Sequence, residues 1–507
     1  MFRFKTWNIV VGWVVFAIAT ICYLLTMEPT TSLWDCSEFI ATSYKLEVGH
    51  PPGAPLFMML ARLASMLALE PASVPVMINA MNCVASGFCI LFLFWTITHL
   101  VRRISVSGDE PISLHKGIAI LGSGAVGALA YAFTDTFWFS AVEGEVYALS
   151  SMFTALVVWL MLKWEENADK PTAPRWIVLI AYLMGLSIGV HILNLLTIPA
   201  LVMIYFFRKV RYTSLPIYLA KMAGALVVSM LILGFINGII IPYTVAIGAW
   251  FDTIAVNSLG MPVNSGMLLF VALLFVGLAA VIALTHYFAL RRLNIVSMAL
   301  MAILIGFSSY ASVTIRANAN PPMNSNNPST PHTLLSMLNR DQYGSRPLLY
   351  GPYYTAIPMP LYEYSYNQKG AVPNPKTDSD DYTPTGDFDS EVMWWLNPQS
   401  GKYEKRTVFK GYAYDSDKQH LFPRMWYLSR DYSPYTDLEV GRGERKISGA
   451  YEWYEPTMAE NIDFFMKYQM GDMFWRYFMW NFVGRQDDVQ LEKDELGTYL
   501  HGGWLSG

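Results

Sequence analysis

Residues 8–26 read NIVVGWVVFAIATICYLLT, a run that contains no charged side chain. A helix needs about 20 mostly apolar residues to cross the hydrocarbon core of a bilayer. Arg3 and Lys5 precede the run, as basic residues do in a signal peptide, but the run is long for a signal sequence. Residues 27–29, Met-Glu-Pro, also lack a small-x-small cleavage site. We therefore predict that this segment is an uncleaved first transmembrane helix.

Other apolar segments of similar length follow it, which are residues 76–101, 117–136, 145–163, 175–190, 192–207, 216–239, 267–290 and 295–314. The composition agrees, because only 15% of the residues are charged, whereas about 25% is usual in soluble domains. The net charge of −4 leaves no basic face for nucleic acid. We predict an α-helical polytopic membrane protein of about nine spans.

Basic residues occupy alternate loops between these segments, which are Arg3, Lys5, Arg102, Arg103, Lys163, Lys170, Arg175, Arg208, Lys209, Arg211, Arg291 and Arg292. The opposite loops before residue 315 contain Lys45, Arg62 and almost no other basic residue. The excess of Lys and Arg in cytoplasmic loops then places the N-terminus in the cytoplasm. The same distribution of basic residues predicts a transmembrane domain over residues 1–315 and a mixed, loop-rich extracytoplasmic region over residues 316–507.

The first outer loop, residues 28–75, contains Asp35, Glu38 and His50. Asp35 and Glu38 are three residues apart, so one helical turn would place both carboxylates on the same face. Burial at membrane level would raise the pKa of a carboxyl group and suit it to act as a base. The alternative is a helix cap at Asp35 and a solvated Glu38, and the spacing leaves both interpretations open.

The second outer loop, residues 135–146, contains Glu143 and Glu145 within an aromatic, apolar stretch. Carboxylates in or near lipid are costly and favour a functional interpretation, whereas carboxylates at the wet headgroup level need none. His191 and Asn194 lie at the turn between two short apolar segments. A lone histidine there is more often structural, but its depth and side match those of the acidic residues.

Arginines return after the last span, at Arg316, Arg340 and Arg346, with Tyr343 between the last two. Guanidinium groups suit bidentate phosphate contacts, which favours a lipid-phosphate site. Pairing with carboxylates inside the extracytoplasmic region is the alternative. Residues 460–483 are aromatic and amphipathic, which is typical of a helix at the membrane surface.

Several motifs together resemble one family, and they are WDCSEF (34–39), GHPPGAPL (49–56), VEGEVY (142–147), GVHILN (189–194) and NRDQYGSRPL (339–348). The family was catalogued as domain of unknown function 2723 and is grouped as glycosyltransferase family 117, the protein O-mannosyltransferase-like membrane enzymes. The similarity runs from residue 8 to about residue 350 and weakens toward the end.

This resemblance implies a GT-C-type fold and an inverting transfer of a sugar, mannose or a similar hexose. The donor is a polyprenyl-phosphate-linked sugar, and the acceptor is a Ser or Thr hydroxyl of an exported protein. The family's base maps onto Asp35, with Glu38 as its partner. Family members often continue into further spans, so we expect this chain to be the N-terminal part of a longer protein.

As a hypothesis, further residues bind the substrates, and they are His50, Glu143, Glu145, His191, Asn194, Arg316, Arg340, Tyr343 and Arg346. Among them, the three arginines would stabilise the departing lipid phosphate, whose charge grows in the transition state. No cofactor is required and no metal ligand is assigned, although a divalent cation is an option at the two glutamates. The expected location is the cell inner membrane, with the active site facing the periplasm.

Two other function classes are alternatives. An ion- or proton-coupled transporter or lipid flippase would need charged residues near the bilayer midplane and broken helices in repeated halves. Here the acidic residues cluster at one face, and no inverted repeat is visible in the sequence. A structural partner of a membrane secretion complex would leave the carboxylates unexplained.

Overall fold

The computed structural model describes residues 3–106, 110–343, 347–356, 388–412, 414, 416–426, 440–448 and 451–483. The chain divides into two compact units, Met1–Arg340 and Asp341–Gly507. Residues 316–340 lie in the first unit, because the helix α15 (Pro331–Asn339) packs against α11 (Ile241–Leu259). The extracytoplasmic location of these residues stays a prediction.

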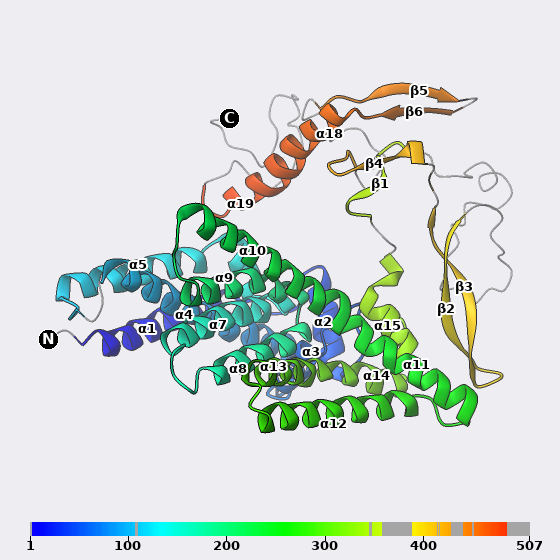
Figure 1. The fold of residues 1–507 in the computed structure, drawn as a ribbon, viewed down its shortest axis with the longest axis horizontal. Coiled ribbons are helices and arrows are strands. Elements are labelled where there is room, and N and C mark those ends of the chain that lie inside the picture. Colours follow the sequence, from blue (N-terminus) through cyan, green and yellow to red (C-terminus); the bar gives the residue numbers. More distant parts are fainter. Residues whose placement is uncertain are drawn as a thin grey trace. The chain divides into compact units, whose positions relative to one another are not determined.

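The first unit is built of helices (Figure 1). Its longer helices are α1 (Phe4–Thr26), α4 (Val74–Ser105), α5 (Leu114–Ala132), α7 (Val146–Glu166), α8 (Pro174–Ile188), α9 (Ile198–Lys209), α10 (Leu215–Phe235), α11, α12 (Ser265–Tyr287) and α13 (Arg291–Phe307). Its shorter helices are α2 (Asp35–Lys45), α3 (Pro55–Ser65), α6 (Asp135–Ala141), α14 (Ala311–Asn318) and α15. Helices suit these apolar segments because lipid offers no partner to a free backbone amide or carbonyl group.

Within the described residues, seven helical segments are long and apolar enough to cross a membrane, or eight if the bent pair α5–α6 is one span. The predicted number of nine spans is therefore not confirmed. Helix α8 has 15 residues, which at 1.5 Å per residue is about 22 Å and falls short of the bilayer core of about 30 Å. The cytoplasmic location of the N-terminus stays a prediction.

The predicted seventh span, residues 216–239, continues well beyond its expected end. One helical segment runs from Leu215 to Leu259, with a π-helical stretch at Ile236–Ile240. Pro242 follows directly, and a proline inside a helix cannot donate the hydrogen bond to the residue four positions earlier. The proline thus explains why the helix changes its pitch here and still continues.

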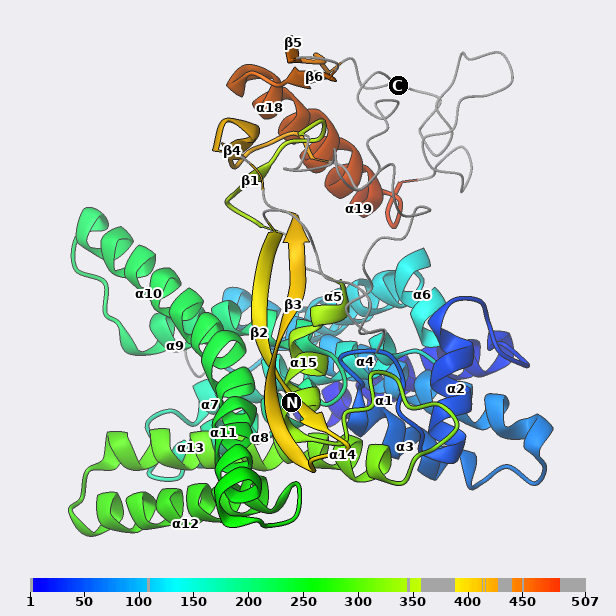
Figure 2. The same cartoon turned by 90° about the vertical axis from the view of Figure 1, so that its right-hand side faces the viewer.

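Neighbouring helices in the first unit follow a simple order. α1 contacts α4 and α5, α4 contacts α7, α7 contacts α8, and α8 contacts α13 (Figures 1 and 2). Two glycines allow the last pair to approach closely. A Cβ atom on Gly185 would lie 2.3 Å from the carbonyl oxygen of Ile303, and one on Gly306 would lie 2.3 Å from the backbone nitrogen of Leu186. The two backbones are therefore in direct contact, as small residues permit in membrane bundles.

We predict that Gly306→Ala destabilises the protein by about 1–3 kcal/mol, because the added methyl group must push α8 and α13 apart. The measurement is thermal unfolding of the protein in detergent. Gly277→Ala in α12 is the matched control, since a Cβ atom there meets no atom within 4 Å. Equal unfolding temperatures for the two variants would contradict the close helix contact.

The described part of the second unit contains antiparallel strand pairs and a helical segment near its end. The strand pairs are β1 (Tyr350–Pro352) with β4 (Gln419–Leu421), β2 (Phe388–Asn397) with β3 (Lys402–Tyr412), and β5 (Glu444–Ser448) with β6 (Tyr451–Glu455). The helical segment comprises α18 (Met458–Phe464), the π-helical residues Phe465–Arg476 and α19 (Tyr477–Met479). The small core of the second unit consists of Tyr354, Met425, Val440, Phe464 and Tyr468.

Candidate active site

The first outer loop is a packed part of the bundle. Phe39 and Ile40 of α2 are buried in the same cluster as Phe57 and Met58 of α3 and Ile78 of α4. Burying a large apolar side chain stabilises a fold by about 1.5–3 kcal/mol. The loop is therefore fixed to the bundle by its own apolar residues, and its polar residues have defined positions.

Helix α2 begins with the two acidic residues of the WDCSEF motif. Asp35 is its first residue, and its side chain is 61% exposed. Glu38 lies one turn later, with a side chain that is only 26% exposed. Trp34 precedes them in the left-handed region, at φ 66°, and is 92% exposed. Because Trp34 is the N-cap residue and no side chain caps the helix, Asp35 does not act as the helix cap that was one alternative.

His50 lies between the two carboxylates. Its backbone N–H donates to Glu38 Oε1 at 2.6 Å, and its ring Nδ1 is 3.1 Å from the same oxygen. Its Nε2 is 3.9 Å from Asp35 Oδ2. Gly49 permits this approach, since a Cβ atom on it would lie 2.9 Å from Glu38 Oε1. The structure thus brings together three of the predicted site residues.

The hydrogen bond between Glu38 and His50 shifts both groups toward their charged forms. It lowers the pKa of Glu38 below its usual value, against the effect of burial. It also raises the pKa of His50, to which the charges of Glu38, Asp35 and Glu145 add. The carboxylate of Glu38 is therefore held by His50, whereas the carboxylate of Asp35 is exposed and accessible from outside the protein.

The second acidic loop lies beside the first. Ser32 donates a hydrogen bond to Glu143 Oε2 at 2.8 Å, and the backbone N–H of Glu28 donates to Val142 O at 3.1 Å. Glu145 is the N-cap of α7 and is only 7% exposed; its Oε1 accepts a bond from the backbone N–H that follows it. The carboxyl group of Glu145 is thus buried within the protein.

Burial raises the pKa of Glu145 to about 7, and the neighbouring charges of Asp35 and Glu143 add to this shift. The carboxyl group of Glu145 therefore changes its charge close to neutral pH, unlike an ordinary glutamate. Such a shift from burial and like charges is common at functional sites.

Two asparagines that sequence reasoning missed hold both loops in place. Asn79 Nδ2 donates to Glu28 O at 2.7 Å and to Thr30 O at 3.0 Å. Asn82 Nδ2 donates to Glu143 O at 2.6 Å and to Glu145 O at 2.7 Å. The sequence does show a sign of this role, which is the pair of amide side chains three residues apart at the start of an apolar span. Polar groups in such spans are costly without a partner.

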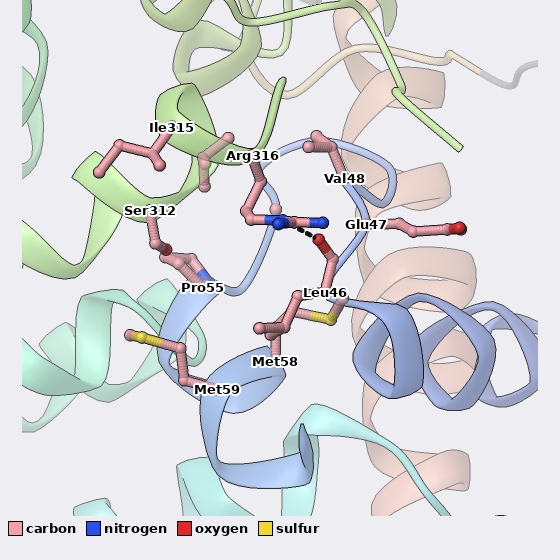
Figure 3. A pocket seen from close by; sticks show the side chains of 11 residues that line it. Leu46, Glu47, Val48, Pro55, Met58, Met59, Ser312, Ile315 and Arg316 are labelled. Atoms are coloured by element: carbon pink, nitrogen blue, oxygen red, sulfur yellow. Dashed lines mark hydrogen bonds between the residues drawn. The ribbon is translucent and has the colours of Figure 1, made fainter. Parts of the chain in front are cut away.

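Arg316 of α14 holds the other end of α2. Its Nε donates to Leu46 O at 2.5 Å, and its Nη2 donates to Lys45 O at 3.3 Å (Figure 3). The last carbonyl groups of a helix have no partner within the helix, so a guanidinium group stabilises them well. Arg316 also lines a cavity of about 140 Å³ with an apolar floor that includes Met58 and Met59.

The following turn is fixed by backbone bonds to the segment after α14. Val48 N–H donates to Met323 O at 3.0 Å, and Ser325 N–H donates to Val48 O at 3.0 Å. The backbone just before Gly49 and His50 is therefore held in place. In this way the segment after α14 helps to fix the position of His50.

His191 and Asn194 have different surroundings. His191 is the N-cap of a short 3₁₀ helix, and its ring accepts a hydrogen bond from Leu193 N–H. The centre of its ring lies 5.4 Å from the centre of the Tyr147 ring. Burial lowers the pKa of His191, and the positive charge of Arg340 adds to this effect. Asn194 is fully buried and accepts a bond from Thr154 Oγ1 at 3.0 Å. The structure places Asn194 in the core.

Two other predicted residues lie outside the first unit. Tyr343 belongs to the second compact unit, and Arg346 lies outside the described residues. In the parts of the chain that the structure describes, no group of three or more His, Cys, Asp or Glu side chains is arranged to hold a metal ion. The option of a divalent cation at Glu143 and Glu145 stays a prediction.

We predict that the pKa of His50, followed by NMR of labelled histidine, lies above the usual 6.5 and falls in the Glu38→Gln variant, which removes the negative charge. Asp35→Asn should lower it less, because that carboxylate is farther from the ring. The His50 signal is assigned by its loss in His50→Gln. An unchanged His50 pKa in Glu38→Gln would be incompatible with the pairing.

Comparison with known proteins agrees with this site. Residues 35–214 match the family model "Protein O-mannosyl-transferase TMEM260 N-terminal domain", and residues 344–466 match a family of unknown function, DUF8416. The chain is 27% identical over 195 residues to "Protein O-mannosyl-transferase tmem260" of Dictyostelium discoideum, a match that covers 36% of this chain and 22% of that protein. It is 28% identical over 175 residues to the Mus musculus protein of the same name, covering 34% and 22% respectively.

No solved structure is significantly similar to the chain. The matched stretch spans about a fifth of the length of both curated relatives. The family-model match over residues 35–214 includes Asp35, Glu38, His50, Glu143 and Glu145. The predicted resemblance to protein O-mannosyltransferase-like membrane proteins is thus confirmed, and residues 35–214 are the part of the chain that carries it.

Proposed function

We propose that the chain is the membrane part of an inverting protein O-glycosyltransferase. It moves a sugar, mannose or a similar hexose, from a polyprenyl-phosphate donor to a Ser or Thr hydroxyl of an exported protein. The observation that carries this proposal is the exposed carboxylate of Asp35 beside the Glu38–His50 pair, at the start of the stretch that matches the family model.

In the proposed reaction the acceptor hydroxyl oxygen attacks the anomeric carbon of the sugar. Its proton passes to the Asp35 carboxylate, while the bond between the anomeric carbon and the phosphate oxygen breaks. The electron pair of that bond leaves with the lipid phosphate, and the anomeric configuration inverts. Asp35 suits this task because it is exposed, whereas Glu38 is held by His50.

Other residues around Asp35 are assigned to binding. Glu143 and Glu145 have acceptor oxygens for sugar hydroxyl groups. Arg316 commits Nε and Nη2 to the end of α2, which leaves Nη1 for an oxygen of the lipid phosphate. Negative charge grows on that phosphate as the glycosidic bond breaks, and a fixed cation stabilises it. We assign Arg340, which acts electrostatically on His191, to the same role.

We place this site on the non-cytoplasmic side of the membrane, facing the periplasm if the membrane is a cell inner membrane. The support is the distribution of basic residues. In the structure, Arg103 pairs with Glu165 and Arg208 pairs with Asp169, so basic residues from two predicted cytoplasmic loops meet carboxylates at the end of α7 and just after it. The acidic loops gather in a separate cluster, as alternation of the loops across a membrane requires.

We predict that Asp35→Asn lowers sugar transfer by about 10²–10⁴-fold, the range that a general base contributes. The measurement is transfer from labelled polyprenyl-phosphate mannose to an acceptor peptide, in membranes that contain the full chain. Glu28→Gln is the matched control, because it removes a carboxylate of the same loop that makes no side-chain bond in the described structure. Its transfer should equal that of the unchanged protein.

Undiminished transfer by Asp35→Asn would remove this residue from the role of base. Consumption of the labelled donor only when peptide is present is the expected result for a transferase. Movement of the labelled lipid across the membrane without peptide, and without release of sugar, would favour a flippase.

We also predict that kcat/KM for the donor rises with pH through an apparent pKa near 7. Glu145 has its pKa raised to about 7, so its carboxyl is protonated below that pH and becomes the negatively charged acceptor of sugar hydroxyl bonds above it. In Glu145→Gln this step of the profile should disappear. A step near pH 7 that persists in Glu145→Gln would assign it to another group.

A further inference from the structure

The helical segment of the second unit has one face that the fold itself covers. Asn461, Phe464, Tyr468 and Asp472 are buried along it. Phe464 and Tyr468 pack in the core with Tyr354. This face therefore already has its partner within the unit, and the rest of the helix surface is turned away from that core.

The last part of the same segment, after Asp472, exposes a row of large apolar side chains. The most exposed ones toward the end of the segment are Met473, Phe474, Trp475, Tyr477, Phe478 and Phe482, at 45–57%. α18, the π-helical residues and α19 follow one another without a break (Figure 2), and all of these residues except Phe482, which follows α19, belong to this continuous helical segment. A cluster of exposed aromatic residues of this kind marks an interaction surface.

Four charged side chains of the segment pair with one another, whereas Glu460 at its start accepts hydrogen bonds from Thr457. Asp463 pairs with Lys467 at 3.0 Å, and Asp472 pairs with Arg476 at 2.7 Å. Arg476 also lies 5.0 Å from the ring centre of Trp480. The exposed row therefore has no strong charge that would select a charged protein or nucleic acid, and its chemistry is that of an aromatic, apolar surface.

We propose that this exposed row lies in the interface between lipid headgroups and acyl chains, and that it anchors the second unit to the membrane surface. Tryptophan, tyrosine and phenylalanine are the residues that prefer this layer, because their rings are large and apolar and the first two also have a polar group. The membrane is also always nearby, because only residues 319–340 separate the last candidate span from the second unit. The proposal does not depend on the sugar-transfer activity.

The test uses the full chain in lipid nanodiscs with one spin label at a time. Phe474→Cys, Phe478→Cys and Met473→Cys place labels on the exposed row, so that one badly folded variant does not decide the result. Glu444→Cys is the control, because its side chain is 68% exposed and pairs with Lys446 in a charged hairpin. Collision rates are measured with oxygen, which concentrates in lipid, and with a water-soluble nickel complex.

We expect the logarithm of the ratio of oxygen to nickel collision rates to be positive at positions 473, 474 and 478 and negative at 444. A negative ratio on the row, equal to that at 444, would overturn the proposal and leave these side chains in water. Immobile labels that neither reagent reaches would also overturn it, since protein, either another chain or a second copy, would then cover the row.

Discussion

The amide groups of Asn79 and Asn82, at the start of α4, join two loops that are far apart in the sequence. One amide donates to carbonyl groups at the start of the first acidic loop, and the other donates to the carbonyl groups of Glu143 and Glu145. Both asparagines are almost completely buried. A hydrogen bond of this kind contributes about 0.5–1.5 kcal/mol, and a buried group that loses its partner costs more. The relative position of the two acidic loops depends on these bonds.

The opposite end of the first loop depends on a second set of contacts. Arg316 neutralises the partial negative charge at the end of α2, and the backbone around Val48 is bonded to the segment after α14. Between these fixed points the turn brings His50 onto Glu38. The acidic cluster is therefore supported from α4 on one side and from α14 on the other, while Asp35 stays open to solvent.

Much of the site was predictable. The carboxylates of both outer loops and His50 were identified because charged groups near lipid are costly and stand out in an apolar chain, and the structure brings them together. Asn194 was selected on the same reasoning, but Thr154 already satisfies its side chain in the core. Asn79 and Asn82 were overlooked because the value of a polar side chain inside a span depends on which loop carbonyl group it meets.

The sequence by itself determined that the first part of the chain is helical and apolar, and that acidic and basic residues alternate between loops. Lipid requires the spans to be helical and apolar, and the two sides of the membrane require the charged residues to alternate between loops, whatever the packing of the helices. Only the tertiary structure decided the ends of the spans, such as the short α8 and the helix that continues past Pro242. It also decided the pairing of Glu38 with His50 and the raised pKa of Glu145, because these depend on burial and on distances between residues that only the packed fold defines.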